Sequence, residues 1–182
     1  QSFLDGKISL PEKTVVITFD DGYLTNGIYA YPIMKKYNFR GTIFMIGYRV
    51  DAPQRLFDPS DTQAISMKRA YRYADIFDFE SHTYDLHGKD ENNIPLIISS
   101  DENTILDDLT KIKDLVGAKY FAYPYGAHNK STIECLRQTG YEMAFTVKPD
   151  YVTKESDKYE LPRFPIAPYT TFDRFVQIVN GK

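Results

Sequence analysis

Apolar and polar positions along this chain form alternating blocks that favour strands followed by helices. Short apolar runs rich in β-branched and aromatic side chains predict strands at residues 14–19, 41–46, 76–81, 120–123, 143–147 and 161–166. Longer segments, with apolar residues on one helical face, predict helices at residues 27–37, 61–74, 101–116, 130–138 and 171–179. This alternation predicts an α/β fold in which right-handed crossovers join parallel strands.

Turn and cap residues mark the boundaries of these elements. Gly117, Gly140 and Gly181 stand where glycines that terminate helices are expected. The Ser-Ser-Asp-Glu run at residues 99–102 predicts a capping box at the start of the helix 101–116. Two long loops, residues 48–60 and 84–100, are expected on the face that carries the site, where they can wall a substrate groove.

Composition narrows the class of protein. A length of 182 residues suits a single domain with a proper core. The net charge of −3 gives no basic surface for nucleic acid, so no such partner is expected. The single cysteine, Cys135, excludes an internal disulfide and is expected to be a buried small hydrophobe in the helix 130–138. The sequence shows neither a signal peptide nor a membrane span.

Two adjacent carboxylates, Asp20 and Asp21, follow the first predicted strand and precede Gly22. Active sites of α/β folds lie at the carboxyl ends of parallel strands. Ionised carboxylates buried there need a metal, a cation or hydrogen bonds to compensate. One of the two can bind a cation while the other moves a proton. The alternative is a surface turn, since Asp-Asp-Gly is also favourable turn chemistry.

Two of the three histidines, His82 and His87, lie five positions apart at the end of the third predicted strand. That spacing shares neither a helix face nor a strand face. Their rings therefore converge only if the chain turns between them, with His82 ending the strand and His87 in the loop. Two neutral imidazoles and a carboxylate form a common open zinc site. The alternative is a capping or surface histidine pair.

Together these segments resemble the motifs of the polysaccharide deacetylase family, also called the NodB-homology or carbohydrate esterase 4 family. The first motif corresponds to residues 18–22, the second to 81–87, and a third to Phe-Ala-Tyr-Pro-Tyr-Gly at 121–126. The histidine spacing and the third motif look most like the branch that deacetylates poly-β-1,6-N-acetylglucosamine. The resemblance implies a distorted (β/α)7 barrel. Six predicted strands fall short of that, so residues 1–182 are expected to form a single, incomplete barrel domain that lacks an N-terminal strand.

The resemblance also implies a role for each residue of these motifs. Asp21, His82 and His87 would hold a divalent metal, zinc foremost, and Asp20 would be the catalytic base. The backbone N–H of Tyr125 would stabilise the oxyanion. The implied reaction is metal-dependent removal of N-acetyl groups from an N-acetylglucosamine polymer, either exopolysaccharide or peptidoglycan. Such an enzyme is expected outside the cell or at its surface, with membrane or cell-wall anchoring through a segment beyond this sequence.

The chain departs from the family pattern at two points. Ala122 stands where most members have the arginine that orients the base, and Arg163 is the expected replacement, reaching Asp20 from another strand. The alternative for Arg163 is a rim salt bridge. No late histidine supplies the general acid, which is expected from a segment upstream of residue 1. His128, the internal rival, is expected to cap the next helix or to face solvent.

Other functions remain open at this stage. The same scaffold suits an O-acetyl esterase or a cyclic-amide hydrolase, and the missing acid suits a non-catalytic glycan-binding module. An intact Asp, His, His set argues against the last reading. The chain has no Trp, so the wall of an acetyl pocket is unassigned.

Overall fold

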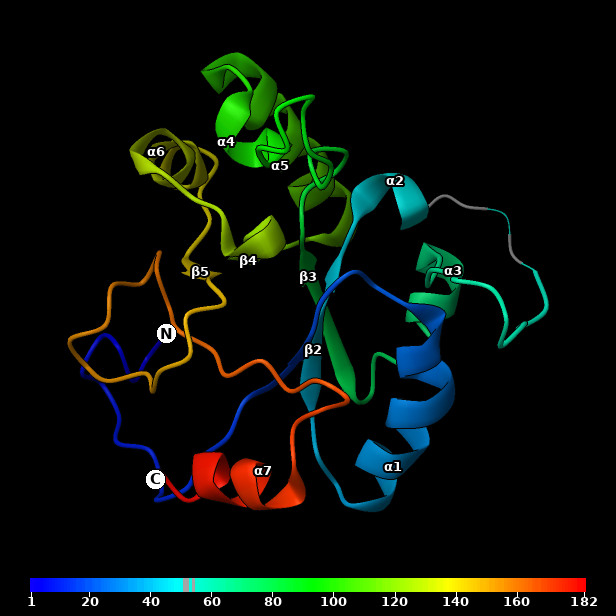
Figure 1. Cartoon of the computed structure of the whole chain (residues 1–182), viewed down its shortest axis with the longest axis vertical. Coiled ribbons are helices and arrows are strands. Elements are labelled where there is room, and N and C mark those ends of the chain that lie inside the picture. The colour runs from blue at the N-terminus through cyan, green and yellow to red at the C-terminus, as the bar shows by residue number, and fades with distance from the viewer. Residues whose placement is uncertain (51–52, 54) are drawn as a thin grey trace.

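The computed structural model describes residues 1–50, 53 and 55–182, whose strands form one parallel sheet curled into part of a barrel (Figure 1). The strands β1 (Ile17–Phe19), β2 (Gly41–Met45), β3 (Phe77–Ser81), β4 (Tyr120–Ala122) and β5 (Met143–Phe145) are hydrogen-bonded neighbours in chain order. A sequential order without reversal is the winding of a barrel, whereas a doubly wound sheet reverses its order. The predicted α/β class and the incomplete barrel are therefore confirmed.

The sixth predicted strand, residues 161–166, is wrong. Leu161 makes an isolated parallel bridge to Phe145, and no strand follows it in the described part of the chain. Pro162 and Pro165 explain this, because a proline lacks the N–H that a ladder needs. The start of the segment still lies along β5, since Leu161 N donates to Ala144 O at 2.9 Å, and it continues with Arg163 N donating to Lys148 O at 3.0 Å. The first strand begins at Ile17, three residues later than predicted.

Helices occupy most of the predicted ranges, with one clear exception. The predicted helix 27–37 is a π-helix (η1, Asn26–Ala30) followed by α1 (Tyr31–Lys36), and three others are confirmed as α5 (Glu102–Val116), α6 (Lys130–Gln138) and α7 (Phe172–Val179). The predicted helix 61–74 is wrong, since only α3 (Met67–Ala70) is helical there. Ala64 instead pairs with Tyr23, and Ile65 N donates to Gly22 O at 2.8 Å, which holds that segment extended.

The helix caps follow the sequence in part. The capping box is wrong, because Asp101 is the N-cap of α5 and accepts from Thr104 N at 3.1 Å, while Ser99 closes the short helix α4 (Leu96–Ser99). Left-handed φ angles of 70° and 71° confirm Gly117 and Gly140 as helix-terminating glycines, and Gly181 also has a φ of 71°. The predicted loop 48–60 begins within α2 (Gly47–Val50), and its residues 51, 52 and 54 lie outside the described residues. The loop 84–100 contains α4.

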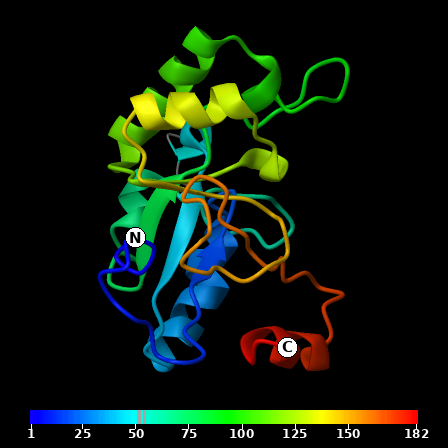
Figure 2. The same cartoon turned by 90° about the vertical axis from the view of Figure 1, so that its left-hand side faces the viewer.

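Two hydrophobic clusters lie between the sheet and its helices. One joins β4 and β5 to α5 and α6 and includes Cys135, which is fully buried as predicted. The other joins β1, β2 and β3 to α1. Figure 2 shows α7 standing apart from these layers, and none of its residues is buried. In the described part of the chain, no helix combines the length and apolar character that crossing a bilayer requires.

Candidate metal centre

The segments that follow β1, β3 and β4 meet at the carboxyl end of the sheet. Asp20 and Asp21 come directly after β1, and His82 comes directly after β3. The short turn Pro124–Gly126 (η2) follows β4. Parallel neighbouring strands end on the same side, so these motifs meet although they lie far apart in sequence.

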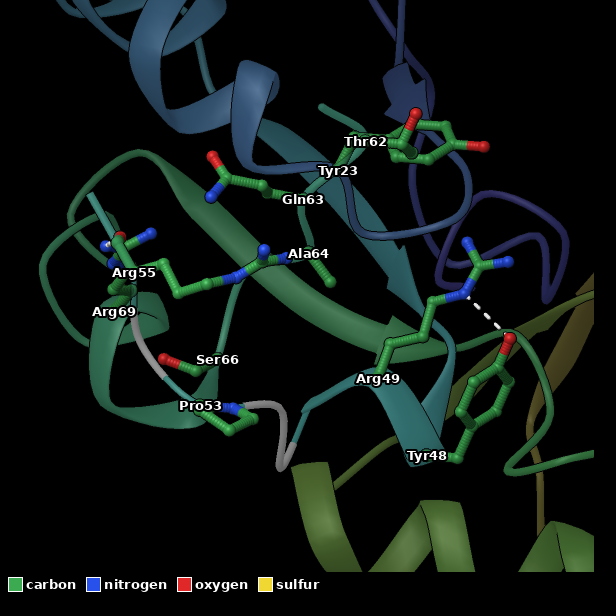
Figure 3. Close-up of a pocket in the computed structure, with 10 residues that line it drawn as sticks. All are labelled: Tyr23, Tyr48, Arg49, Pro53, Arg55, Thr62, Gln63, Ala64, Ser66 and Arg69. Carbon is green, nitrogen blue, oxygen red and sulfur yellow. Dashed lines mark hydrogen bonds between the residues drawn. The ribbon is translucent and has the colours of Figure 1, made fainter. Parts of the chain in front are cut away.

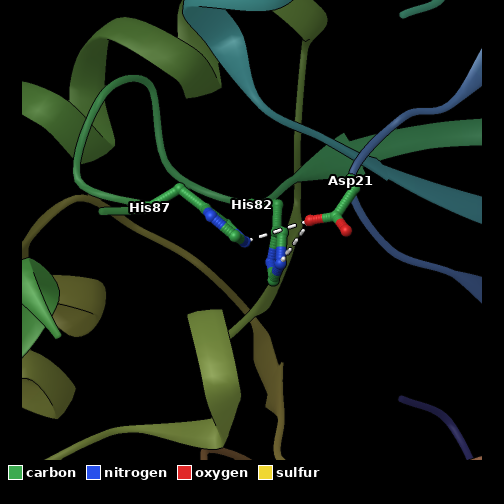
Figure 4. Close-up of side chains that lie close together, drawn as sticks. All are labelled: Asp21, His82 and His87. Atoms are coloured by element: carbon green, nitrogen blue, oxygen red, sulfur yellow. Dashed lines mark ion pairs between the residues drawn. The ribbon is translucent and has the colours of Figure 1, made fainter. Parts of the chain in front are cut away.

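Asp21, His82 and His87 converge as the sequence predicted (Figure 4). One atom from each lies within 4.8 Å of the others. Asp21 Oδ1 is 3.0 Å from His87 Nε2 and 3.6 Å from His82 Nε2. Among the described residues, no donor forms a hydrogen bond with the buried Oδ1 atom of Asp21. A bound cation would supply the partner that such a buried oxygen needs. Burial raises the pKa of Asp21, but His87 and His82 outweigh it and lower that pKa to about 2.

His82 is held in the state that a metal needs. Its Nδ1 lies 2.7 Å from the backbone oxygen of Ala122, which can only accept, so Nδ1 carries the proton and Nε2 turns a lone pair toward Asp21. Burial also lowers the pKa of His82 and keeps its ring neutral. Ala122, where the family arginine is missing, thus contributes its carbonyl to the centre.

The backbone around the centre adopts left-handed conformations at non-glycine residues. Asp21 has a φ of 69°, Thr83 of 71° and Tyr125 of 58°. Gly22, with a φ of 66°, packs so closely that a Cβ there would lie 2.8 Å from Met45 Sδ. Such conformations cost energy and cluster at functional sites.

Arg163 reaches Asp20, as predicted. Its Nη1 donates to Asp20 Oδ1 and its Nη2 to Asp20 Oδ2, both at 2.8 Å. The guanidinium also donates from Nε to Thr146 O and is flanked by the rings of Phe44 and Phe145, 5.6 and 5.9 Å away. Both oxygens of Asp20 are thereby fixed in a bidentate pair. The catalytic role of the two residues stays a prediction.

Tyr125 contributes both its backbone and its ring to the edge of the centre. The Tyr125 amide has no acceptor among the described residues, so it is free to bind an oxyanion. Its half-exposed ring lies 5.1 Å from the ring of His87, with Lys89 Nζ 4.8 Å above it. The ring gives the unassigned acetyl pocket a candidate wall, which the sequence reasoning missed because only the backbone of Tyr125 was considered.

His128 differs from its expectation. Asn129, not His128, caps α6, by accepting from Thr132 N at 2.9 Å. His128 Nε2 lies 2.9 Å from Glu160, and its ring stacks on Tyr123. These contacts give no support to His128 as the general acid.

A cavity of about 420 Å³ is lined in part by Tyr23, which follows Asp21 by two residues (Figure 3). Its walls include Tyr23, Tyr48, Arg49, Arg55 and Arg69. Burial and the neighbouring Asp21 carboxylate raise the pKa of Tyr23, so this wall of the cavity lies within the electrostatic reach of a cation ligand. The described part of the loop 48–60 thus borders a hollow, as expected. Its arginines carried no recognisable motif in the sequence.

Comparisons with known proteins agree with this geometry. A family model described as polysaccharide deacetylase matches residues 7–144. The poly-beta-1,6-N-acetyl-D-glucosamine N-deacetylase of Staphylococcus aureus is 31% identical over 181 residues, which is 96% of this chain but only 61% of that protein. The structure of IcaB from Ammonifex degensii superimposes with a TM-score of 0.82 at 28% identity, covering 98% of this chain and 78% of that one. The deacetylase PplD of Streptococcus pyogenes, solved with acetate, shares the fold, with a TM-score of 0.80 at 21% identity over 98% of this chain and 75% of that one.

Proposed function

This chain belongs to the polysaccharide deacetylase family, and from that premise we propose that it hydrolyses N-acetyl groups of an N-acetylglucosamine polymer. The observation that carries the proposal is the convergence of Asp21, His82 and His87 beside an Asp20 held by Arg163. The similarity to the Staphylococcus aureus enzyme favours a β-1,6-linked exopolysaccharide over peptidoglycan. The chain spans only about three fifths of that relative, so activity and substrate are proposals for the whole protein.

The three ligands suit a catalytic zinc ion. Two imidazoles and one carboxylate leave a coordination position for water or substrate, which a structural site does not. A divalent cation held there supplies Lewis-acid polarisation of the acetamide carbonyl and lowers the pKa of a bound water. The neutral His82 and the ionised Asp21 are ready to bind without first losing protons.

Asp20 is the proposed base. Its carboxylate accepts the proton of the attacking water, while the bidentate contact with Arg163 fixes the direction of its oxygens. A fixed direction matters, because proton transfer needs the acceptor within hydrogen-bond reach of the water. Charge on the carbonyl oxygen then develops beside the free amide of Tyr125, which donates to it.

The neighbouring cavity is the proposed place for a further sugar of the polymer. Its tyrosine rings and arginine N–H groups offer both flat faces and donors for hydroxyl groups. We propose that the reaction takes place outside the cell or at its surface, where such polymers are found. A histidine from a segment upstream of residue 1 remains the proposed general acid, and membrane or cell-wall anchoring remains a proposal of the same kind.

The test separates the metal chemistry from the missing acid. Zinc binding is measured by calorimetry for the chain and for His82→Ala, and hydrolysis is measured on para-nitrophenyl acetate and on a β-1,6-linked N-acetylglucosamine oligomer. The phenolate leaves without protonation, so the ester needs the cation and Asp20 but no general acid. We expect one-to-one zinc binding and ester hydrolysis, both lost in the variant.

Two outcomes decide between the alternatives. Ester hydrolysis without amide hydrolysis locates the defect in the acid only if adding the upstream segment then raises acetate release from the oligomer and leaves ester hydrolysis unchanged. A chain that binds no zinc and hydrolyses neither substrate refutes the proposal and favours a glycan-binding module.

A further inference from the structure

The start of the loop that carries His87 is hydrogen-bonded to one buried carboxylate, that of Asp108 on α5. Asp108 Oδ1 accepts from Tyr84 N at 2.7 Å. Its Oδ2 accepts from Asp85 N at 2.6 Å and from Leu86 N at 3.0 Å. Asp108 is only 8% exposed, so three consecutive amides provide the hydrogen bonds that this buried carboxylate needs.

The opposite edge of the same turn is held by α2. Gly47 N donates to Thr83 O at 3.0 Å, and Tyr48 N donates to Tyr84 O at 2.9 Å. A Cβ on Gly47 would lie 2.3 Å from the Tyr84 ring, so α2 approaches as closely as a glycine allows. The carbonyls of the turn therefore face α2, and its amides face Asp108.

This double attachment surrounds a strained residue. Thr83 has a φ of 71°, a conformation that β-branched residues rarely adopt. It is fully buried, and its hydroxyl has no hydrogen-bond partner among the described residues. Such strain persists only where the surrounding structure over-determines it. The turn directly follows His82 and brings the ring of His87 to 4.9 Å from the ring of His82.

We propose that Asp108 is a positioning residue for the metal centre, holding the turn 83–86 in the conformation that sets His87 beside His82. This inference rests on the proposed function, because it concerns ligands for the cation proposed there. Asp108 touches neither the cation nor the substrate and acts through the backbone alone. The assignment also explains a buried acid that the hydrolytic chemistry does not use.

The contact pattern makes a sharp substitution available. Asp108 uses both of its oxygens, so Asp108→Asn turns an N–H₂ group toward at least one amide of the turn. The neighbouring Asp107 is exposed on the same helix, and Asp107→Asn makes the same change of charge as a matched control. Comparing these two variants separates loss of the attachment from loss of a charge on α5.

The experiment measures zinc affinity by calorimetry in the folded chain and the visible spectrum of the cobalt-substituted chain. We expect zinc binding about 10- to 100-fold weaker in Asp108→Asn, as for other residues that orient metal ligands, with an altered cobalt spectrum. Asp107→Asn should match the parent chain. Equal zinc affinity in the two variants overturns the inference. Failure of the parent chain to bind zinc removes the proposed function and the inference with it, which is a distinct result.

One further measurement is independent of how well Asp108→Asn folds, and a second uses a double variant. In the unaltered chain, hydrogen exchange at the amides of Tyr84, Asp85 and Leu86 should be as slow as inside α5, and fast exchange there contradicts the attachment. Adding Thr83→Gly to Asp108→Asn should recover part of the zinc affinity, since glycine adopts a positive φ without strain. No recovery shows that Asp108 does not offset the strain at Thr83.

Discussion

Replacement of Arg163 by lysine tests whether the proposed base must be held at both oxygens. Arg163 donates two bonds to Asp20 at 2.8 Å, one to Thr146 O at 2.9 Å and one to Thr18 Oγ1 at 3.1 Å. Lysine keeps the charge but has one nitrogen, so it cannot hold both oxygens of Asp20 in the same geometry. The substitution therefore removes the constraint on the orientation of the Asp20 carboxylate while leaving a positively charged side chain near it.

The structure sets the size of two separate effects. Each lost hydrogen bond to a charged group is worth about 1.5–3 kcal/mol when buried. The side chains of Asp20 and Arg163 are 30% and 15% exposed, so water and the lysine ammonium replace part of the loss. We expect the free energy of unfolding to fall by about 2 kcal/mol in total. For a chain of this length that corresponds to a fall in Tm of about 4–8 °C.

The effect on turnover should be larger than the effect on stability. Misplacing a catalytic group by about 1 Å can reduce the rate about 100-fold. We expect kcat on para-nitrophenyl acetate to fall about 100-fold in Arg163→Lys with little change in KM, because Arg163 faces the base rather than the cavity. Zinc affinity should stay unchanged, since the cation ligands are different residues.

The control is Arg40→Lys, which alters an exposed arginine–aspartate pair with Asp78 at 3.3 Å. An exposed pair contributes about 0–1 kcal/mol, so this variant should match the parent chain in both Tm and kcat. A kcat for Arg163→Lys within about threefold of the parent would show that the bidentate contact with Asp20 does not matter for turnover.

Three other changes give separable results. His82→Ala should weaken zinc binding at least about 100-fold by calorimetry, because His82 belongs to the cluster with Asp21 and His87. His128→Ala should leave zinc binding unchanged, because His128 contacts Glu160 instead. Burial raises the pKa of Glu80, so the folded chain favours the protonated form of this carboxyl. The stability that protonated Glu80 contributes is present below the unfolded pKa of 4.5 and is lost as pH rises through the higher folded pKa. Its two amide donors share Oε2, which a Gln oxygen can replace, so urea unfolding should show the advantage of Glu80→Gln over the parent growing from about pH 4 to pH 7. Asn129→Ala removes the cap of α6 and should cost about 1 kcal/mol in thermal unfolding, with zinc affinity unchanged as its control.

The parts of the fold that the sequence predicted are those where local pattern and packing agree. Helix α5 has its apolar stripe, its Asp101 cap and its terminal glycine in register, so it was found to within one residue. Residues 61–74 failed because partners remote in sequence override the helical pattern, with Gly22 and Tyr23 pairing to the extended residues 64 and 65. At residues 161–166, the prolines lack the backbone N–H groups that pairing with a neighbouring strand requires. The apolar pattern of the segment does not reveal this loss.

The candidate site shows the same division. Residue types and spacing indicated a site at the Asp pair and the His pair, but the family resemblance was needed to assign Asp21 as the cation ligand. The same resemblance revealed the missing arginine at Ala122 and so led to Arg163. Asp108 and the ring of Tyr125 were not, since their roles depend on where α5 and η2 lie relative to the loop of His87. Chain geometry of this kind leaves no signature in one sequence.

The contact between Arg163 and Asp20 spans 143 positions of the chain, whereas the three cation ligands lie within residues 21–87. A ribosome delivers the ligands long before it delivers the arginine, because synthesis proceeds from the N-terminus. The emerging chain therefore acquires its metal ligands first and a directed base last. The same separation applies to proteolysis: a cut ahead of Arg163 would leave a fragment able to capture metal yet poor at turnover.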